Sequence, residues 1–191
     1  MRTASISRKT KETDISLTLN LDGTGKCDIS TGIGFFDHML TSLTVHGGFD
    51  LTLKTVGDLE VDTHHTVEDT GIVLGQAFTK ALGDKSGIVR FGTATIPMDE
   101  ALGFTCLDIS NRPFLVYDAD FEDVKIGDYD ACMTEEFMRA FAFNAGITLH
   151  IQATYGTNDH HKCEAMFKAL ARALRQAVVP SGAVASTKGT L

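Results

Sequence analysis

An internal repeat is the feature of this chain that most constrains its fold. Residues 52–65 read TLKTVGDLEVDTHH, and residues 148–161 read TLHIQATYGTNDHH. The two segments start 96 positions apart, which is about half of the 191-residue chain. A glutamate follows each histidine pair at the same distance, Glu68 in the first segment and Glu164 in the second. The repeat predicts two copies of one structural unit that share a core.

Helix and strand patterns surround both copies of the repeat. Apolar residues recur at helical spacing after each histidine pair, at Val67, Leu74, Phe78 and Ala81 and then at Met166, Phe167, Leu170, Leu174 and Ala177. Upstream of each unit, residues 36–45 and 134–145 are also predicted to be helical. Strands are predicted at residues 15–21, 27–29, 93–97, 103–109 and 114–117.

The order of strands, helix, strand and helix, present twice, predicts the fold class. Helices that cover one face of mixed or antiparallel sheets indicate an α+β protein, here an internally duplicated sandwich of sheets and helices in two halves. We expect a single domain over residues 1–191, with pseudo-repeats at about 1–90 and 91–180. The turn-rich segment 83–92 is the expected boundary. The tail, 181–191, taken alone, has the composition of a disordered terminus.

The charge and hydropathy of the chain exclude two classes of partner. Its formal net charge of −8 is unfavourable for binding nucleic acid or an anionic membrane. Its apolar runs fall far short of the roughly 18 residues that span a bilayer, and residues 1–14 have no apolar core of signal-peptide length. We therefore expect a cytoplasmic protein. Its cysteines, Cys27, Cys106, Cys132 and Cys163, are expected to be buried and reduced.

Each copy of the repeat contains the motif H-H-x-x-E, which has the residue types of a metal site. If the pair opens a helix, His64 and Glu68 lie on one surface, and so do His160 and Glu164. Adjacent helical residues point about 100° apart, so one pair cannot easily chelate a single ion. A lone H-x-x-x-E is common as a weak surface pair, but its recurrence at the same offset favours two metal ions.

The donor set consists of imidazoles and carboxylates without thiolates. It excludes iron–sulfur and cysteine-type zinc sites, and it suits Mn²⁺, Fe²⁺, Co²⁺ or Zn²⁺. Three ligands from each half would leave open positions on both ions, as catalysis requires. Two other histidines have simpler interpretations. His150 is typical of a core or surface residue, and His46, before two glycines, is also typical of a helix C-terminal cap.

Several cations outside the motif suggest an anionic ligand. Arg112 stands in an Asn-Arg-Pro turn, and arginine forms paired bonds to phosphate. Arg90 and Lys168 are further candidates, and the tail string STKG (186–189) combines hydroxyls, backbone donors and a cation. Each cation taken singly is also consistent with an ordinary solvated charge. Together with a metal pair, they suggest a small phosphorylated substrate.

Five strings of the sequence resemble one known family. They are GIGFFDHML (32–40), DTHHTVEDTGI (62–72), RFGTATIPMDEAL (90–102), NDHHKCEAMFKALARALRQA (158–177) and STKG (186–189). They look like imidazoleglycerol-phosphate dehydratase, a hydro-lyase of histidine biosynthesis that converts imidazole glycerol phosphate into imidazole acetol phosphate. The resemblance covers nearly the whole chain, and the paired histidines are its most specific part.

The resemblance implies a fold, an assembly and a metal site. The fold would be similar to the second domain of ribosomal protein S5. The assembly would be a homo-oligomer of 24 subunits built from trimers, with active sites between subunits. Two Mn²⁺ ions per site would be held by His38, His64, His65, Glu68, Glu136, His160, His161 and Glu164. Glu136 is a departure, because the family usually has histidine there. It matches His38 in the repeat with a two-residue slip.

The resemblance also implies the substrate contacts. Glu12 matches the acid/base glutamate of the family, and His46 belongs to a segment that lines the site. The other substrate-binding positions would be Arg90, Arg112, Lys168, Ser186, Thr187 and Lys188. In this interpretation the tail is part of the active site.

The chemistry explains why such groups are needed. The hydrogen lost from carbon is not beside a carbonyl, so the imidazole ring of the substrate must serve as the electron sink. Two cations on the ring nitrogens would favour the imidazolate, which could expel the neighbouring hydroxyl to give a diazafulvene-like intermediate. We hypothesise Glu12 as the acid/base group, with Glu164 as the competing candidate.

Two other functions stay open at this point. One is a metal-dependent hydrolase, which would release inorganic phosphate. The other is a structural shell organised by metal ions, in which Arg90, Arg112 and Lys188 could be replaced without loss of function.

Overall fold

The computed structural model describes residues 2–182 and Ser186, and it contains one arrangement of elements twice. The first half comprises β1 (Thr3–Lys9), β2 (Thr13–Asn20), β3 (Cys27–Ser30), α1 (Gly34–Gly47), β4 (Asp50–Gly57) and α2 (His64–Leu82). The second half comprises β5 (Phe91–Met98), β6 (Ala101–Asp108), β7 (Phe114–Asp118), α3 (Met133–Ala145), β10 (Thr148–Tyr155) and α4 (Asp159–Ala177). A small hairpin, β8 (Lys125–Ile126) and β9 (Tyr129–Asp130), precedes α3. The predicted α+β class and internal duplication are confirmed.

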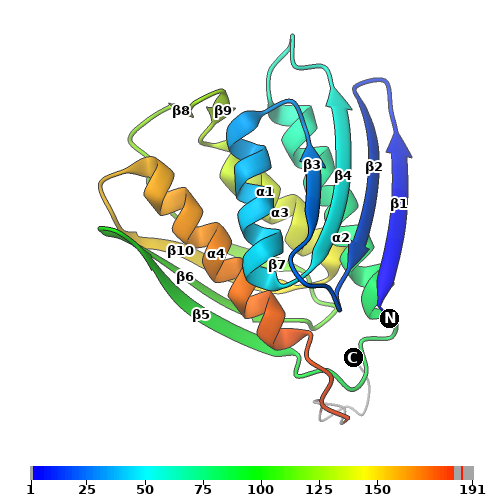
Figure 1. The fold of residues 1–191 in the computed structure, drawn as a ribbon. Coiled ribbons are helices and arrows are strands. Elements are labelled where there is room, and N and C mark those ends of the chain that lie inside the picture. Colours follow the sequence, from blue (N-terminus) through cyan, green and yellow to red (C-terminus); the bar gives the residue numbers. More distant parts are fainter. Residues whose placement is uncertain (1, 183–185, 187–191) are drawn as a thin grey trace.

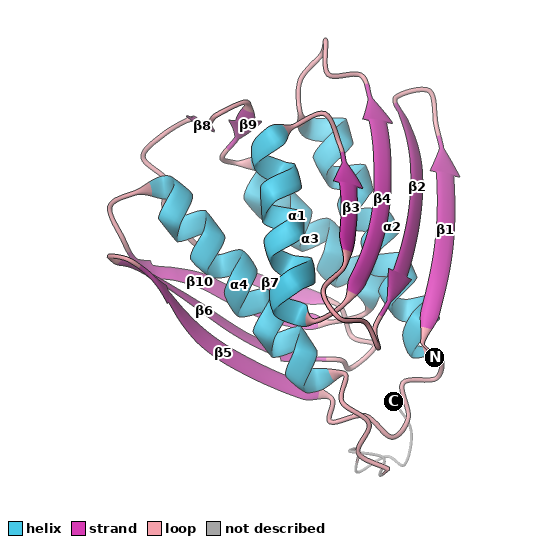
Figure 2. Cartoon of the chain, in the orientation of Figure 1, coloured by secondary structure: helices cyan, strands magenta, loops and turns pink. Residues whose placement is uncertain are grey.

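The two halves form two sheets of the same topology. The strand order is β1-β2-β4-β3 in one sheet and β5-β6-β10-β7 in the other. In each sheet the last pair, β4 with β3 or β10 with β7, is parallel. Figures 1 and 2 show the helices between the two sheets. Because α2 packs on α3 and α1 packs on α4, each helix pair combines both halves, and the halves share one core.

Buried cross-strand pairs establish which residues are equivalent in the two halves. Leu19 pairs with Leu51 on β2 and β4, and Leu107 pairs with Leu149 on β6 and β10. All four leucines are buried. Equivalent residues are therefore 88 positions apart in the leading hairpins and 98 apart in β4 and β10. The offset of 96 holds for the histidine pairs but is wrong for the strands, because His160 follows Leu149 by 11 positions whereas His64 follows Leu51 by 13.

The same two-residue slip relates α1 to α3. Both helices end at a glycine in the left-handed conformation, Gly48 with φ 69° and Gly146 with φ 67°. Glycine adopts this conformation without a steric penalty, so it is the common helix terminator. His38 and Glu136 each lie ten residues before their glycine. The two side chains are therefore at equivalent positions of the duplicated fold.

Helix α4 lies directly on the second sheet because two strand positions are glycine. A Cβ atom at Gly103 on β6 would lie 2.4 Å from the carbonyl carbon of Ala165. One at Gly92 on β5 would lie 2.0 Å from the carbonyl oxygen of Ala173. This close approach positions α4, which carries the second histidine pair, against the β5–β6 hairpin.

Substitution of Gly103 by valine is expected to lower the free energy of unfolding by about 1–3 kcal/mol or more, because the new side chain overlaps the α4 backbone. Urea denaturation followed by circular dichroism measures this change. Gly34→Ala is the control, since a Cβ atom there would meet nothing within 4 Å. Equal unfolding midpoints for Gly103→Val and the native chain would contradict the close packing of α4.

All four cysteines are free thiols, as expected, but their predicted burial is wrong for three of them. Cys163 is buried and unpaired as expected, but Cys27, Cys106 and Cys132 are exposed free thiols. Cys106 illustrates the reason: it stands on β6 between the buried Thr105 and Leu107, so strand alternation turns it outward. Strand β1 was also missed, because it lies at the sheet edge and its inward positions are Ala4, Ile6 and Arg8, of which only Ala4 is fully buried. In the described part of the chain, no helix is long and apolar enough to cross a membrane.

Candidate active site

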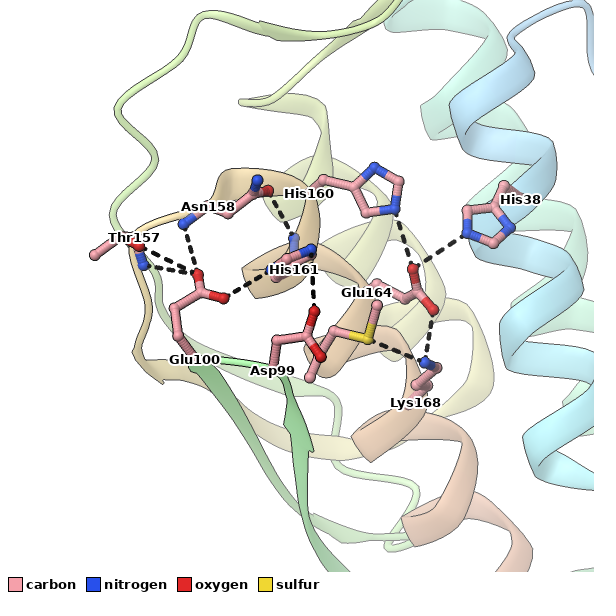
Figure 3. A network of polar contacts seen from close by, with 10 residues as sticks. His38, Asp99, Glu100, Thr157, Asn158, His160, His161, Glu164 and Lys168 are labelled. Atoms are coloured by element: carbon pink, nitrogen blue, oxygen red, sulfur yellow. Dashed lines mark hydrogen bonds and ion pairs between the residues drawn. The ribbon is translucent and has the colours of Figure 1, made fainter.

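Three of the predicted ligands meet where α1 packs against α4. Because α4 begins at Asp159, His160 and Glu164 lie one turn apart near its start, as the motif predicts. Nε2 of His160 lies 3.1 Å from Oε2 of Glu164, and Nε2 of His38, on α1, lies 3.2 Å from the same oxygen. Figure 3 shows both rings turned toward this carboxylate. The Glu164 side chain is only 8% exposed, whereas both rings reach solvent, so a ligand can approach from the histidine side.

The neighbours of Glu164 keep its carboxyl ionised. Burial acts to raise its pKa, but the Lys168 ammonium, with Nζ 2.6 Å from Oε1, and the two histidines lower the pKa to about 2. A carboxyl with so low a pKa can hold a cation at neutral pH but is poorly suited to donate a proton there. The surroundings of Glu164 therefore favour a role as ligand over a role as acid/base group.

His46 lies on the cationic side of this cluster, in the last turn of α1. Partial burial, followed by the charges of Lys168 and Arg172, lowers the pKa of His46. The ring is therefore neutral at neutral pH and can accept or donate one hydrogen bond. Lys168 and Arg172 thus place positive charge near His46 and Glu164.

The tip of the β5–β6 hairpin holds the second histidine of the α4 pair. Nδ1 of His161 lies 2.7 Å from Oε2 of Glu100 (Figure 3). The backbone N–H groups of Thr157 and Asn158 donate to the other oxygen of Glu100, at 3.1 and 2.8 Å. The hydrogen bond with His161 lowers the pKa of Glu100 to about 2 and raises the pKa of His161. The rings of His160 and His161 are inclined at 81°, so they face different directions, as adjacent helical residues should.

The histidine pair of the first half has a similar arrangement. Helix α2 begins at His64, whose Nε2 lies 3.4 Å from Oε2 of Glu68. Nδ1 of His65 lies 3.0 Å from Oδ2 of Asp58, which follows β4 directly. Nε2 of His65 lies 3.8 Å from Oε1 of Glu12, at the tip of the β1–β2 hairpin. The hydrogen bond with Asp58 raises the pKa of His65.

Glu12 is open to solvent beside this pair. Its side chain is 53% exposed. It lines a hollow of about 420 Å³ together with Asp58, Lys9 and Lys11. A hollow of this size accommodates a small molecule. The position of Glu12 is therefore compatible with the acid/base role that the family resemblance implies.

The structure groups the predicted ligands across the two halves. His38 belongs to the first half, yet it lies with the second-half residues His160 and Glu164, because α1 packs on α4. Among the residues that the structure describes, these three form the one group of three or more ligand atoms within 4.8 Å of one another. Two imidazoles and a carboxylate at such spacing are the donors that divalent transition metals prefer. The chemistry and spacing of this group fit a metal ion.

Glu136 is the counterpart of His38 on α3. Its carboxylate lies 3.6 Å from Nε of Arg139, one turn along the helix. Helix α3 packs on α2, which carries His64 and Glu68. The duplication therefore places Glu136 on the helix next to the first-half pair. Its binding to a metal ion stays a prediction.

The predicted phosphate-binding residues lie in separate places. Lys168 lies next to Glu164. Arg90 instead donates two hydrogen bonds to the carboxylate of Asp108, at 2.6 and 2.9 Å, and Arg112 lies 3.5 Å from the same carboxylate. Ser186 is partly buried, and Thr187 and Lys188 lie outside the described residues. The roles of all these residues toward substrate stay predictions.

Strand β6 separates the two arginines from the histidine cluster. Asp108, which holds them, ends this eight-residue strand, and Glu100, which holds His161, immediately precedes it. At about 3.4 Å per residue, the two ends of the strand are roughly 25 Å apart. A small substrate therefore cannot touch His161 and Arg112 of one chain at the same time.

Three residues of this site were not identified from the sequence alone. Glu100 has a signal in principle, because it follows Glu12 by 88 positions on the equivalent hairpin. That offset differs from the offset of 96 between the histidine pairs. The equivalence of Glu12 and Glu100 is therefore visible only once the strand pairing is known. Arg172 follows Lys168 by one helical turn, which is a weak signal. Asp58 has none, because only the return of the chain from β4 to α2 brings it to His65.

Comparison with known proteins agrees with this geometry. The family model described as imidazoleglycerol-phosphate dehydratase matches residues 31–174. The imidazoleglycerol-phosphate dehydratase of Methylorubrum populi is 57% identical and aligns over 100% of both chains. That of Acetivibrio thermocellus is 58% identical over 97% of each chain.

Solved structures show the same likeness. The crystal structure of imidazoleglycerol-phosphate dehydratase from Staphylococcus aureus has a TM-score of 0.85 at 40% identity, covering 93% of this chain and 99% of that chain. The Pyrococcus furiosus structure, in complex with (S)-C348, has a TM-score of 0.86 at 39% identity, covering 97% of this chain and 100% of that chain. On this match of sequence and fold, the chain belongs to the imidazoleglycerol-phosphate dehydratase family.

Proposed function

We propose that this chain dehydrates imidazoleglycerol phosphate to imidazole acetol phosphate in histidine biosynthesis, using two Mn²⁺ ions per active site. The observation that carries the proposal is the convergence of His38 and His160 on the buried carboxylate of Glu164, in a chain of this family. The competing hydrolase would need the same ligands. It is less favoured because the family match extends over both histidine pairs and not only over a metal motif.

The ligands expected to hold the ions come from both halves of the chain. They are His38, His64, His65, Glu68, Glu136, His160, His161 and Glu164. When bound, the ions would supply Lewis acidity that lowers the pKa of the substrate imidazole and makes the ring an electron sink. Glu164 supports this arrangement by staying ionised between two imidazoles.

We expect an exposed carboxylate to carry out the proton transfers. Glu12 suits this role because it lies at a hairpin tip, open to solvent, 3.8 Å from Nε2 of His65. A carboxyl in that place can take up the carbon-bound proton of a substrate in the adjacent hollow and can deliver a proton to a leaving hydroxyl. Glu164 is the less suitable candidate, since Lys168 and two histidines already occupy its oxygens.

The phosphate group would bind between two copies of the chain. Lys168 lies beside Glu164. Arg90 and Arg112 lie with Asp108, roughly 25 Å from the end of β6 that holds His161. This separation supports active sites between subunits, with the arginines and the tail residues Ser186, Thr187 and Lys188 provided by a neighbouring copy. A homo-oligomer of 24 subunits built from trimers is the assembly that we propose.

The decisive experiment is turnover of imidazoleglycerol phosphate before and after removal of metal. Chelation followed by gel filtration is expected to abolish formation of the ketone product, and added Mn²⁺ is expected to restore it. Mass spectrometry of the product and a phosphate assay are read together. Release of inorganic phosphate would identify a hydrolase instead. If the chain shows no turnover with any metal, and Arg112→Ala assembles as the native chain does, the protein would be identified as a structural shell.

A further inference from the structure

The duplication places two glutamates at the same position of two equivalent hairpins. In the first hairpin Lys9 pairs with Asp14, and in the second Pro97 pairs with Leu102. Glu12 and Glu100 each lie two residues before the second member of that pair. Each hairpin tip approaches the second histidine of its own half, His65 or His161.

The two glutamates nevertheless approach opposite nitrogens of the imidazole. Oε1 of Glu12 lies 3.8 Å from Nε2 of His65, beyond hydrogen-bond distance. Oε2 of Glu100 lies 2.7 Å from Nδ1 of His161, a short hydrogen bond. In the first half, Nδ1 of His65 is held by Asp58, at 3.0 Å. Both rings therefore have a carboxylate on Nδ1, provided by different elements.

A glycine explains why the second half uses its hairpin for this purpose. Asp58 follows the last residue of β4, and Gly156 follows the last residue of β10. Gly156 has φ 152°, and a Cβ atom there would lie 2.7 Å from Cβ of Ala101 and from Cγ of Lys162. A side chain like that of Asp58 has no room at this position. Glu100 takes its place in holding the ring.

The contacts of Glu100 use both of its oxygens. Oε2 is bonded to His161, and Oε1 accepts from the N–H groups of Thr157 and Asn158 at the start of α4 (Figure 3). These three bonds fix the carboxylate and leave it poorly placed to exchange protons with a substrate. Glu12 is half exposed, and the nearest ring nitrogen is 3.8 Å away. Equivalent positions have therefore acquired different surroundings.

We propose that Asp58 and Glu100 are positioning residues that orient His65 and His161 for metal binding. A carboxylate that accepts from Nδ1–H keeps the proton of the neutral ring on that nitrogen, so the lone pair is on Nε2. The ring then presents Nε2 to a metal ion in a fixed direction. Because Asp58 performs this task in the first half, Glu12 is left available for proton transfer. The inference rests on the proposed function in one respect, namely that these histidines bind metal.

The test is a titration of the metal-free chain with Mn²⁺ alone, followed by calorimetry, and with Co²⁺ alone, followed by visible absorption. Glu100→Ala and Asp58→Ala are each expected to weaken Mn²⁺ binding 10–100-fold, the usual effect of removing a carboxylate behind a ligating histidine. The Co²⁺ spectrum should change in shape, which reports altered ligation. Glu100→Gln should recover part of the affinity, because its one amide oxygen can still accept from Nδ1–H of His161, although the bonds from Thr157 and Asn158 to the other oxygen are lost.

Asp99→Asn is the matched control on the same hairpin. Its carboxylate lies 3.8 Å from Nε2 of His161 and its side chain is 76% exposed, so the substitution removes the same charge without removing a hydrogen bond to Nδ1. It is expected to weaken Mn²⁺ binding much less than Glu100→Ala. An equal loss in both variants, or native affinity in Glu100→Ala, would overturn the positioning role.

A second measurement separates this inference from the proposed function. If the native chain binds neither Mn²⁺ nor Co²⁺, the metal-dependent function fails. The orientation of the ring is still measured, by ¹⁵N NMR of labelled histidine in the metal-free chain at a pH where the ring is neutral. We expect His161 with its proton on Nδ1 in the native chain and a mixture of tautomers in Glu100→Ala. The same tautomer in both would overturn the positioning role.

Discussion

Replacement of Glu12 by glutamine is expected to reduce kcat for imidazoleglycerol phosphate by about 10²–10⁴-fold, the usual contribution of a positioned acid/base group. Glutamine preserves the shape of the side chain but cannot exchange a proton at neutral pH. The fold and the metal content should not change, since Glu12 is half exposed at a hairpin tip. Steady-state kinetics and the Mn²⁺ content of each chain, measured by mass spectrometry, check both parts.

Two further variants make this result specific. Glu122→Gln, an exposed glutamate between β7 and β8, is the charge-matched control and should retain native kcat. Glu164→Gln should lose bound Mn²⁺ together with turnover, because His38, His160 and Lys168 all contact that carboxylate. Full turnover in Glu12→Gln would remove Glu12 from the mechanism. If Glu164→Gln loses turnover but keeps its bound Mn²⁺, the result would instead favour Glu164 as the acid/base group.

Mixing two inactive variants is expected to restore activity. A chain with His160→Ala lacks a predicted metal ligand, and a chain with Arg112→Ala lacks a predicted phosphate contact at the other end of β6. If each site combines His160 of one copy with Arg112 of another, about one quarter of the sites in a random mixture take His160 from an Arg112→Ala chain and Arg112 from a His160→Ala chain. Co-refolding equal amounts of the two variants should therefore raise turnover from near zero to about that fraction of the native value.

The position of Arg112 makes it the better choice for this experiment. Its side chain is 64% exposed, so its removal should not disturb folding, whereas Arg90 is largely buried against Asp108. Gel filtration of each variant alone confirms that the assembly forms. If the mixed assemblies contain both variants and turnover does not recover, then one chain provides both residues or Arg112 does not contact substrate.

Local spacing accounts for much of what could be predicted. The i, i+4 relation of His64 to Glu68 and of His160 to Glu164 follows from helix geometry once the pair opens a helix, and both helices do begin there. The divergence of adjacent imidazoles follows from the same geometry. The apolar periodicity of α2 and α4 identified residues that are buried in the core.

Contacts between distant elements could not be predicted in this way. His38 contacts Glu164 only because α1 packs on α4, and no spacing within either segment specifies that pairing. Asp58 reaches its histidine from the loop after β4, and Glu100 reaches its histidine from the tip of the β5–β6 hairpin. The repeat offset is 98 residues for β4 and β10 but 88 for the hairpins, so no single offset aligns these positions. The exposure of Cys106 depended likewise on which face of β6 turned outward.

By itself, the sequence determined the duplicated α+β architecture, the two histidine–carboxylate pairs and the family, because these depend on periodicity and short-range spacing along the chain. Only the tertiary structure decided which helix contributes the third ligand beside Glu164, which carboxylate lies on each Nδ1, and how far the arginines lie from the histidine cluster. Those features depend on the packing of both halves around one core. Packing is a sum over many weak contacts between distant segments, and a local pattern does not encode it.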